Sequence, residues 1–414
     1  MNPDGRRAWS PVFQRFAWSQ ASSQFAAQTA SAAIPLLALT TLHVQDTQVG
    51  LISFAQFLPV ILLTLLLGAI IDSTSKVTPM LIGHAGRALV FALLAVLAST
   101  GRLQLSTLLV AVFLAGALTA AFDVAVQGVV PYLAPSAKLV EANRRIQLTY
   151  SLAQVLGPTA AGALVGLGYP ALAFAAISIV YAGAFFLLLP VRATPTKPES
   201  PLNASVFRRL NAGLRFSFSD RVLRRLLIAG SIFNLTEQAL ITTFLVRASR
   251  DLGISAGLLG VILSAGGLGA VAAAAAMRHA KPRSPAVLMV VAMSGATLSP
   301  ILLLFVSDAG VFDQVLAIMV FFLYGSGLVI YNVLAVTLRQ QRAPLVMRSR
   351  IGAVYRFFAY GSLGFGGLVS SALIAVAGAA LALVLIVAGM AVATVVYASS
   401  LLRVRHEIDD GLVA

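Results

Sequence analysis

Long apolar stretches alternate with short polar breaks along most of the chain. A helix needs roughly 20 apolar residues to cross a hydrocarbon layer of ~30 Å. The pattern therefore predicts an all-α membrane protein with twelve transmembrane helices. Their expected ranges are 13–42, 49–71, 79–98, 105–133, 143–168, 170–190, 226–248, 254–277, 285–306, 311–338, 349–377 and 379–402.

One polar segment is longer than the others and divides the predicted helices six plus six. Residues 191–225 hold prolines, serines and many basic residues, which is typical of a solvent-exposed linker. A surface helix is expected within it, over residues 204–218. We therefore predict an N-terminal six-helix half over 1–190, a cytoplasmic linker over 191–225 and a C-terminal six-helix half over 226–414.

The two predicted halves also resemble each other in sequence. One constant shift along the chain aligns Gly157 with Gly366 and Pro135 with Pro344. A repeat of six helices keeps the same orientation in the membrane, and transporters built from such repeats bind substrate near the bilayer midplane between them. The repeat favours two pseudo-symmetric halves around a central site.

Composition agrees with a membrane protein, since 59% of the residues are hydrophobic and 10% are charged, against about 25% charged in soluble domains. The net charge of +15 does not indicate nucleic acid, because cytoplasmic loops of membrane proteins collect basic residues. If the chain crosses the membrane twelve times, the basic segments all lie on the same side of it. We therefore expect a multi-pass protein of the bacterial inner membrane with both termini in the cytoplasm. These segments are Arg6 and Arg7, Lys76, 138–145, the linker, 278–283, 339–350 and 403–405.

Several classes of function are disfavoured. The chain has no cysteine and only four histidines, so a metal site is not expected. It carries neither a phosphate-binding loop nor a nucleophile–base pattern, which argues against an enzyme and against any cofactor. We expect the partners to be a small-molecule substrate, protons and the lipid bilayer, and we expect a monomer.

Glu237 is the candidate for proton coupling. It lies about 16 Å into the helix predicted over 226–248, at 1.5 Å per residue, and is therefore near mid-bilayer. An ionised carboxylate there costs roughly 2.5–3.5 kcal/mol, so burial favours the neutral form. Such a group can exchange a proton with one aqueous face and then with the other. The alternative is a neutral glutamic acid that is held by an interhelical hydrogen bond and has no role in turnover.

Asp123 is a second candidate for proton coupling, on the helix predicted over 105–133. It forms a stripe with Thr119 and Gln127, spaced by one helical turn. Arg87 is predicted at a similar depth from the same side of the membrane. An Asp123–Arg87 ion pair would then be structural rather than part of transport, and both readings stay open.

Further polar side chains are expected to line a central cavity, because amides and hydroxyls are costly to expose to lipid. Ordinary packing is the alternative for Tyr331 and Asn332. For Arg356 the choice is between a contact with an anion and a cytoplasmic anchor. The candidate substrate-binding residues are Gln20, Gln24, Gln28, Thr119, Gln127, Asn234, Gln238, Tyr324, Tyr331 and Asn332.

A family resemblance rests on motifs spread over nearly the whole chain. Gly68 and Asp72, followed by Lys76, are similar to the Gly-x-x-x-Asp-Arg signature of major facilitator transporters. The other motifs resemble the subgroup that holds enterobactin exporters and macrolide efflux pumps. They are Phe122-Asp123, Glu141-Ala142-Asn143, Gln154 to Pro158 with Gly162, Phe244 to Arg247, and Asn332-Val333.

The resemblance implies roles for conformational residues. It places Gly68, Asp72 and Lys76 at a cytoplasmic gate. Helix five would bend at Gly157, Pro158 and Gly162, with close packing as the alternative. Arg87 and Arg356 are the remaining candidates for a conformational role. This chain departs from the family at Ser73, where an arginine is usual, and within 23–27, where alanine replaces an acid that many relatives carry.

These observations predict a secondary active transporter. We expect a proton-coupled exporter of hydrophobic small molecules, such as a drug, an antibiotic or a siderophore, that works by alternating access. One alternative is an uncoupled or lipid-type transporter that flips lysophospholipids. A non-transporting membrane receptor is the other, disfavoured because no signalling domain is attached.

Overall fold

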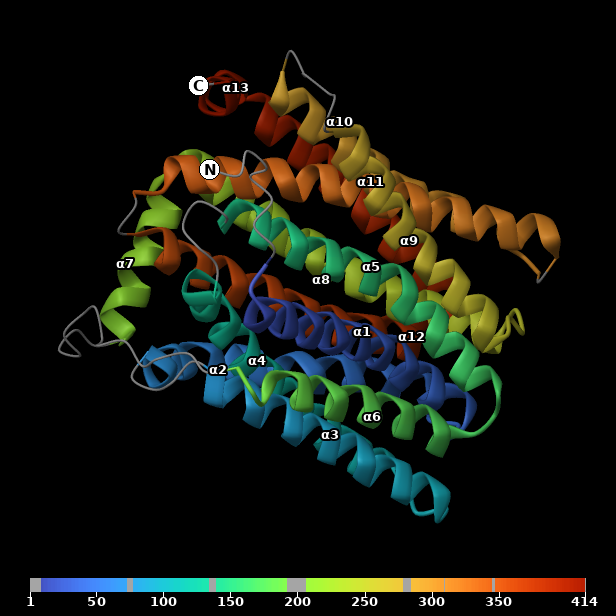
Figure 1. The fold of residues 1–414 in the computed structure, drawn as a ribbon. Helices are drawn as coiled ribbons and strands as arrows, with labels where there is room; N and C mark the ends of the chain where they lie inside the picture. The colour runs from blue at the N-terminus through green and yellow to red at the C-terminus, as the bar shows by residue number, and fades with distance from the viewer. Residues whose placement is uncertain are drawn as a thin grey trace.

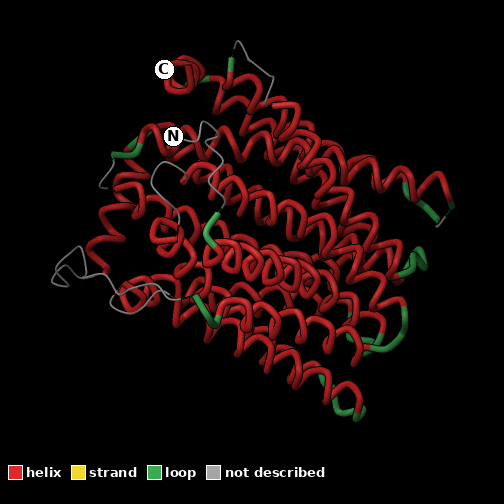
Figure 2. The backbone as a smooth tube through the Cα atoms, in the orientation of Figure 1, coloured by secondary structure: helices red, strands yellow, loops and turns green. Residues whose placement is uncertain are grey.

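The computed structural model describes residues 9–72, 77–133, 139–191, 206–277, 284–308, 310–344 and 347–413. Over these residues the chain is helical, without strands (Figure 2). The first bundle of helices comprises α1 (Pro11–Thr40), α2 (Val49–Asp72), α3 (Val77–Ser99), α4 (Leu105–Leu133), α5 (Leu139–Gly166) and α6 (Pro170–Leu188). The second comprises α8 (Arg221–Arg250), α9 (Ala256–Met277), α10 (Pro285–Leu298), α11 (Val311–Arg342) and α12 (Arg348–Leu402). We refer to these as the N-terminal and C-terminal bundles.

Most helices begin and end within a few residues of their predicted ranges, and two regions differ in detail. The span predicted over 285–306 starts as α10 and continues as the 3₁₀ segment η3 (Ser299–Phe305). Pro300 lies at the start of this segment and has no N–H for a regular helical hydrogen bond. The spans predicted over 349–377 and 379–402 form one element, α12. They are separated at Gly378, whose φ of 74° and ψ of 165° lie outside the helical region.

Among the described residues, eight helices are long and apolar enough to cross a membrane. They are α2, α3, α4, α6, α9, α10 with η3, α11, and α12, which holds two predicted spans. The predicted spans that correspond to α1, α5 and α8 fall outside this set because their sequences are more polar, with glutamines in α1 and several arginines in α8. Polar residues are expected on helices that line a cavity inside a membrane protein.

Within each bundle the helices run side by side (Figure 1). In the N-terminal bundle α1 packs on α5 and α6, α2 on α4, and α3 on α4 and α6. In the C-terminal bundle α8 packs on α12, α9 on α11, and α10 on α11 and α12. The predicted domain boundaries at residues 190 and 226 stay a prediction.

Two seams join the bundles, one between α2 and α12 and one between α5 and α9. Glycines lie at both. Gly50 of α2 meets Gly367 of α12, and Gly162 of α5 meets Gly260 of α9. A Cβ added at Gly162 would lie 2.6 Å from the Ala256 carbonyl oxygen. The absence of side chains therefore lets the backbones approach closely, as small residues do at other membrane helix interfaces.

Two polar helices lie at the end of the molecule that we term the α7 end. The first, α7 (Val206–Ser219), falls where the surface helix over 204–218 was expected, and Figure 1 shows it across the ends of the bundles. The second, α13 (Arg405–Val413), was not predicted because it is short and polar. Asp409 ties it to α10 by accepting hydrogen bonds from the Ala286 amide at 2.9 Å and the Ser284 hydroxyl at 2.7 Å.

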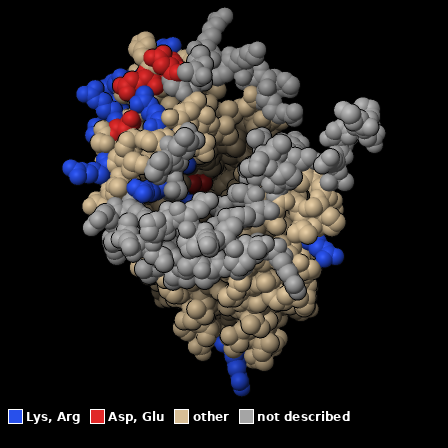
Figure 3. All heavy atoms as spheres, turned by 60° about the vertical axis from the view of Figure 1, so that its left-hand side comes forward, with Lys and Arg blue, Asp and Glu red and all other residues tan. Residues whose placement is uncertain are grey.

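The two ends of the molecule differ. At the far end, opposite α7, Arg250 of α8 forms an ion pair with Asp46 at 3.5 Å and donates to the Val44 carbonyl at 3.1 Å. This contact joins the two bundles, because Asp46 and Val44 lie in the connection between α1 and α2 and Arg250 lies at the end of α8. Figure 3, which looks toward the α7 end, shows a hollow with an acidic side chain in its depth and basic residues beside it. The molecule is therefore tied at one end and hollowed at the other.

Candidate functional site

A cavity of about 580 Å³ lies in the α7 half of the C-terminal bundle, between α8, α11 and the first part of α12. Its wall is mixed, with apolar residues between amide, hydroxyl and guanidinium groups. Four of the predicted site residues are among those that line it, namely Asn234, Tyr331, Asn332 and Arg356.

Three polar residues of this wall were not predicted as site residues. Ser231 precedes Asn234 by three positions on α8, Arg339 follows Tyr331 by eight on α11, and Tyr355 is next to Arg356 on α12. The first two share helix faces with predicted residues, so helical spacing could have found them. Tyr355 also stacks against the Arg339 guanidinium, which lies 4.5 Å from the ring centroid.

Glu237 lies on α8 about one turn beyond Asn234. The hydroxyl of Tyr324 of α11 faces its carboxyl group, but that hydroxyl makes no hydrogen bond of regular geometry. The Tyr324 ring is held in place because it stacks on Phe233, with the ring centroids 5.8 Å apart. Half-buried Glu237 and buried Tyr324 thus form a polar pair between α8 and α11 whose hydrogen-bonding capacity is not used up.

The N-terminal bundle contributes polar groups from the opposite side. The Tyr150 hydroxyl of α5 faces Gln28 of α1 and is within electrostatic range of both Asp123 and Glu237. Asp123 is also within electrostatic range of Arg356. Tyr150 therefore couples electrostatically to both acidic candidates, which lie on different bundles.

Asp123 and Arg87 do not form the ion pair that the sequence suggested. Arg87 is within electrostatic range of Asp123, but no salt bridge joins their described side chains. The Arg87 guanidinium is fully buried and donates to the Gly83 carbonyl at 2.9 Å and the Ser23 hydroxyl at 3.3 Å.

Aromatic rings complete the surroundings of Arg87. Its guanidinium carbon lies 4.6 Å from the centroid of Phe122 and 4.5 Å from that of Tyr181. The guanidinium also donates to Nδ1 of His84 at 3.3 Å. Cation–π contacts and hydrogen bonds thus stabilise this cation, and it packs inside the N-terminal bundle rather than facing the cavity.

Two other predicted substrate-binding residues use their polar groups within the protein. Gln238 donates to the Ser53 hydroxyl of α2 at 3.0 Å and to Thr242 at 3.2 Å. It therefore bridges the bundles and is absent from the cavity wall described above. Thr119 donates to the Ala115 carbonyl of its own helix at 2.8 Å, so its hydroxyl has a partner without any substrate.

The glutamines of α1 differ in their surroundings. Gln20 is buried, and its side-chain carbonyl oxygen has no hydrogen-bond partner. Gln24 and Gln28 are half-buried. The side chain of Gln127 lies outside the part of the structure that is described.

The predicted conformational residues fall into two sets. Gly157 packs on Gln28, and the carbonyl of Pro158 packs on Gly260, so both lie at close helix contacts, as Gly162 does. Gly68 and Asp72 lie at the end of α2, where side chains are not described, and Lys76 lies outside the described residues. Within the described part of the chain, no group of three or more histidine, cysteine or acidic residues could hold a metal ion.

Comparisons with known proteins agree with this architecture. The family model described as "Transmembrane secretion effector" matches residues 8–411. The chain is 27% identical over 233 residues to the uncharacterized MFS-type transporter y4rN of Sinorhizobium fredii (strain NBRC 101917 / NGR234), which covers 54% of this chain and 56% of that protein. It is 29% identical over 163 residues to the staphyloferrin A transporter of Staphylococcus aureus (strain NCTC 8325 / PS 47). That alignment covers 39% of this chain and 41% of the relative. The chain thus aligns with about half the length of the curated relatives it matches.

A solved structure supports the fold independently. The crystal structure of the nucleoside transporter NupG superposes with a TM-score of 0.75, at 12% identity, and covers 94% of this chain and 98% of that one. This likeness confirms the predicted all-α membrane fold. The match of one family model to nearly the whole chain shows the family, whose members are multi-pass transporters of small molecules. The chain belongs to the transmembrane secretion effector family of major facilitator transporters.

Proposed function

We propose that this transporter exports a hydrophobic or amphipathic small molecule across the bacterial inner membrane in exchange for protons. The observation that carries the proposal is the position of Glu237, a carboxyl group in the middle of α8, beside a polar cavity and facing the Tyr324 hydroxyl. An ionisable group at this depth marks a functional site in membrane proteins. A carboxyl that alternates between two aqueous faces can couple proton entry to substrate exit.

In this proposal the cavity wall binds the substrate. Asn234, Tyr331, Asn332 and Arg356 supply polar contacts, and the apolar residues between them accommodate a hydrophobic body. A mixed wall of this kind suits ligands with few polar groups on an apolar frame. Gln20, Gln24 and Gln28 are proposed to contact the substrate from the N-terminal bundle.

The energy source is proposed to be the proton gradient. Moving one elementary charge across a potential of 100 mV is worth about 2.3 kcal/mol, and no nucleotide-binding motif was found in the sequence. The two bundles would rock about the α2–α12 and α5–α9 seams, which gives alternating access. Asp123 is a second site for proton binding in this scheme, because it lies within electrostatic range of Arg356 on the other bundle.

The class of substrate is proposed to include siderophores. The relative from Staphylococcus aureus is named a staphyloferrin A transporter, and its name supports a siderophore beside the drugs and antibiotics that the family resemblance suggests. The bilayer and protons are the other proposed partners, and the proposed unit is a monomer.

Transport in everted membrane vesicles tests this function. We expect vesicles that contain the protein to accumulate at least one probe from a panel of a lipophilic dye, a macrolide and a citrate-type siderophore. Accumulation should require an imposed proton gradient and collapse when a protonophore is added. Accumulation that survives the protonophore would instead support the uncoupled transporter.

Reporter fusions test the proposed orientation. A reporter fused after Arg403 or within 195–203 should be active in the cytoplasm, and reporters near Asp46 and Asp308 should be active outside. The basic residues of the α7 end give the physical reason, because short basic loops are retained in the cytoplasm. A cytoplasmic signal at Asp308 would contradict the six-plus-six arrangement.

A further inference from the structure

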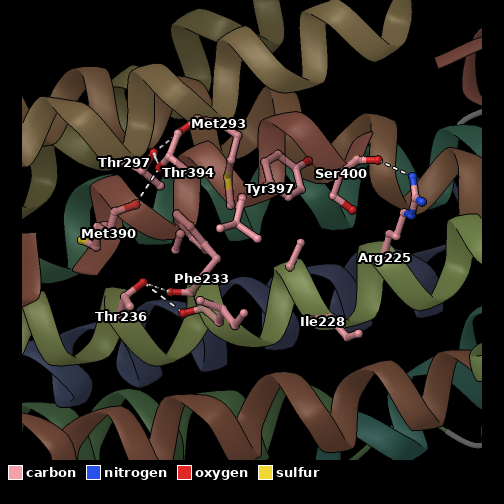
Figure 4. A pocket seen from close by; sticks show the side chains of 14 residues that line it. Arg225, Ile228, Phe233, Thr236, Met293, Thr297, Met390, Thr394, Tyr397 and Ser400 are labelled. Carbon is pink, nitrogen blue, oxygen red and sulfur yellow. Dashed lines mark hydrogen bonds between the residues drawn. The ribbon is translucent and has the colours of Figure 1, made fainter. Parts of the chain in front are cut away.

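A second cavity, of about 620 Å³, lies in the C-terminal bundle on another side of α8, between α8, α10 and the last part of α12 (Figure 4). We call it the lateral groove. Its lining is mainly apolar, with Arg225 at the α7 end and hydroxyl groups toward the middle of the bundle. Its walls include Ile228 and Ile232 of α8, Met293 of α10, and Met390 and Ala393 of α12.

The lateral groove is separate from the central cavity and lies at the outer surface. On α8 it is lined by Ile228 and Ile232, whereas the central cavity is lined by Ser231 and Asn234. At about 100° per residue the centres of these two pairs lie roughly 110° apart around the helix axis, so they occupy different faces of α8. Ile228, Ile232 and Val396 are 47%, 42% and 60% exposed. In a membrane-spanning bundle, such exposed apolar residues face lipid, so the groove opens toward acyl chains.

The three threonine hydroxyls inside the groove need no polar ligand, and the Tyr397 hydroxyl, which has no hydrogen-bond partner of regular geometry, is itself buried. Thr297 and Thr394 are hydrogen-bonded to each other, and both hydroxyls also contact carbonyls of their own helices. Thr236 donates to the carbonyls of Ile232 and Phe233 at 3.0 Å. These satisfied hydroxyls make the inner part of the groove suitable for hydrocarbon.

The α7 end of the groove has the opposite character. Arg225 donates to the Ser400 carbonyl (Figure 4), and no carboxylate lies within salt-bridge distance of it in the described part of the chain. Arg403 lies one turn beyond Ser400, and Arg221 one turn before Arg225, both exposed. A guanidinium keeps its charge at any physiological pH and suits phosphate. The end of the groove is therefore positively charged where lipid headgroups lie.

We propose that the lateral groove binds an acyl chain of an anionic phospholipid, with its phosphate beside Arg225. The stretch from Arg225 to Thr236 spans about 16 Å at 1.5 Å per residue, which is about half of a ~30 Å hydrocarbon layer. One acyl chain of one leaflet matches this length. The lipid is bound at the leaflet on the α7 side, and the charged end selects anionic over zwitterionic headgroups.

Native mass spectrometry of the purified full chain tests this site, with phosphatidylglycerol and phosphatidylcholine of identical acyl chains added in equal amounts. The wild type should retain one phosphatidylglycerol in preference to phosphatidylcholine. Arg225→Gln should lower that preference about fivefold, the effect expected for one basic residue at an anionic surface. Arg225→Lys should retain it, because the positive charge remains.

A second variant tests the apolar part of the groove. Ala393→Phe places a ring in the lumen from a partly exposed position, and it should reduce retention of both lipids while the protein keeps its thermal stability without added lipid. Arg102→Gln is the matched control, since it removes one exposed charge at the far end and should leave the preference unchanged. Equal retention of the two lipids by the wild type, or an unchanged preference in Arg225→Gln, would overturn the proposal.

Discussion

Glu237→Gln is expected to reduce transport driven by a pH gradient to the level of vesicles that lack the protein. Glutamine keeps the shape of the neutral carboxyl group and a hydrogen-bonding oxygen facing Tyr324, but it cannot bind and release a proton. The variant should therefore fold and bind substrate. Exchange of labelled for unlabelled substrate, which needs no net proton movement, should continue at a rate close to that of the wild type.

The measurement is uptake by everted vesicles with and without an imposed pH gradient, next to an exchange assay on the same preparation. Glu407→Gln is the matched control, because it removes an acid on α13, which pairs with Arg342 at 3.5 Å outside the predicted spans. If Glu237→Gln pumps at the wild-type rate with the wild-type pH dependence, proton coupling at this residue is excluded. Asp123 is then the next acid to test.

Gly260→Ala is expected to destabilise the protein and to impair transport. A Cβ at this position would overlap the Pro158 carbonyl and lie 2.9 Å from the Gly162 Cα, and both neighbours are backbone atoms that cannot rotate away. Overpacking of this kind costs about 1–3 kcal/mol. The α5–α9 seam would have to separate, so the contact about which the bundles are proposed to move would be lost.

Gly257→Ala provides a matched control on the same helix, since an added Cβ there meets nothing within 4 Å. Both substitutions gain helix propensity, about 1 kcal/mol per residue, so the contact at the seam is what separates them. Thermal unfolding in detergent should show a lower midpoint for Gly260→Ala and an equal or higher one for Gly257→Ala. Equal midpoints in the two variants would show that the seam tolerates a methyl group.

The helices were predictable because each apolar run is long enough to identify a span without knowledge of its neighbours. The 3₁₀ segment after α10 and the polar helix α13 were missed, because neither interrupts or extends an apolar run. Gly378 was predicted only as a break in hydropathy. Its positive φ shows that the chain turns at this residue with almost no loop.

The depth of each candidate site residue along its helix could be estimated from the sequence, but the direction in which its side chain points could not. Position along a span places Arg87 and Asp123 at similar depth, but it does not say which neighbour each side chain faces. Arg87 turns toward α1 and α6, where Ser23 and Tyr181 hold it. Glu237 faces Tyr324 of α11, and that pairing depends on the rotation of two helices about their axes. Helix rotation follows from packing across the bundle, which a single sequence does not display.

The Arg250–Asp46 tie at the far end is sensitive to the ionic strength of the medium on that side. The side chains of Arg250 and Asp46 are 33% and 41% exposed, and ion pairs as exposed as this contribute at most about 1 kcal/mol. Dissolved salt screens them further. In the proposed alternating-access scheme, a medium of high ionic strength would therefore favour opening at the far end, whereas a medium of low ionic strength would favour the closed tie.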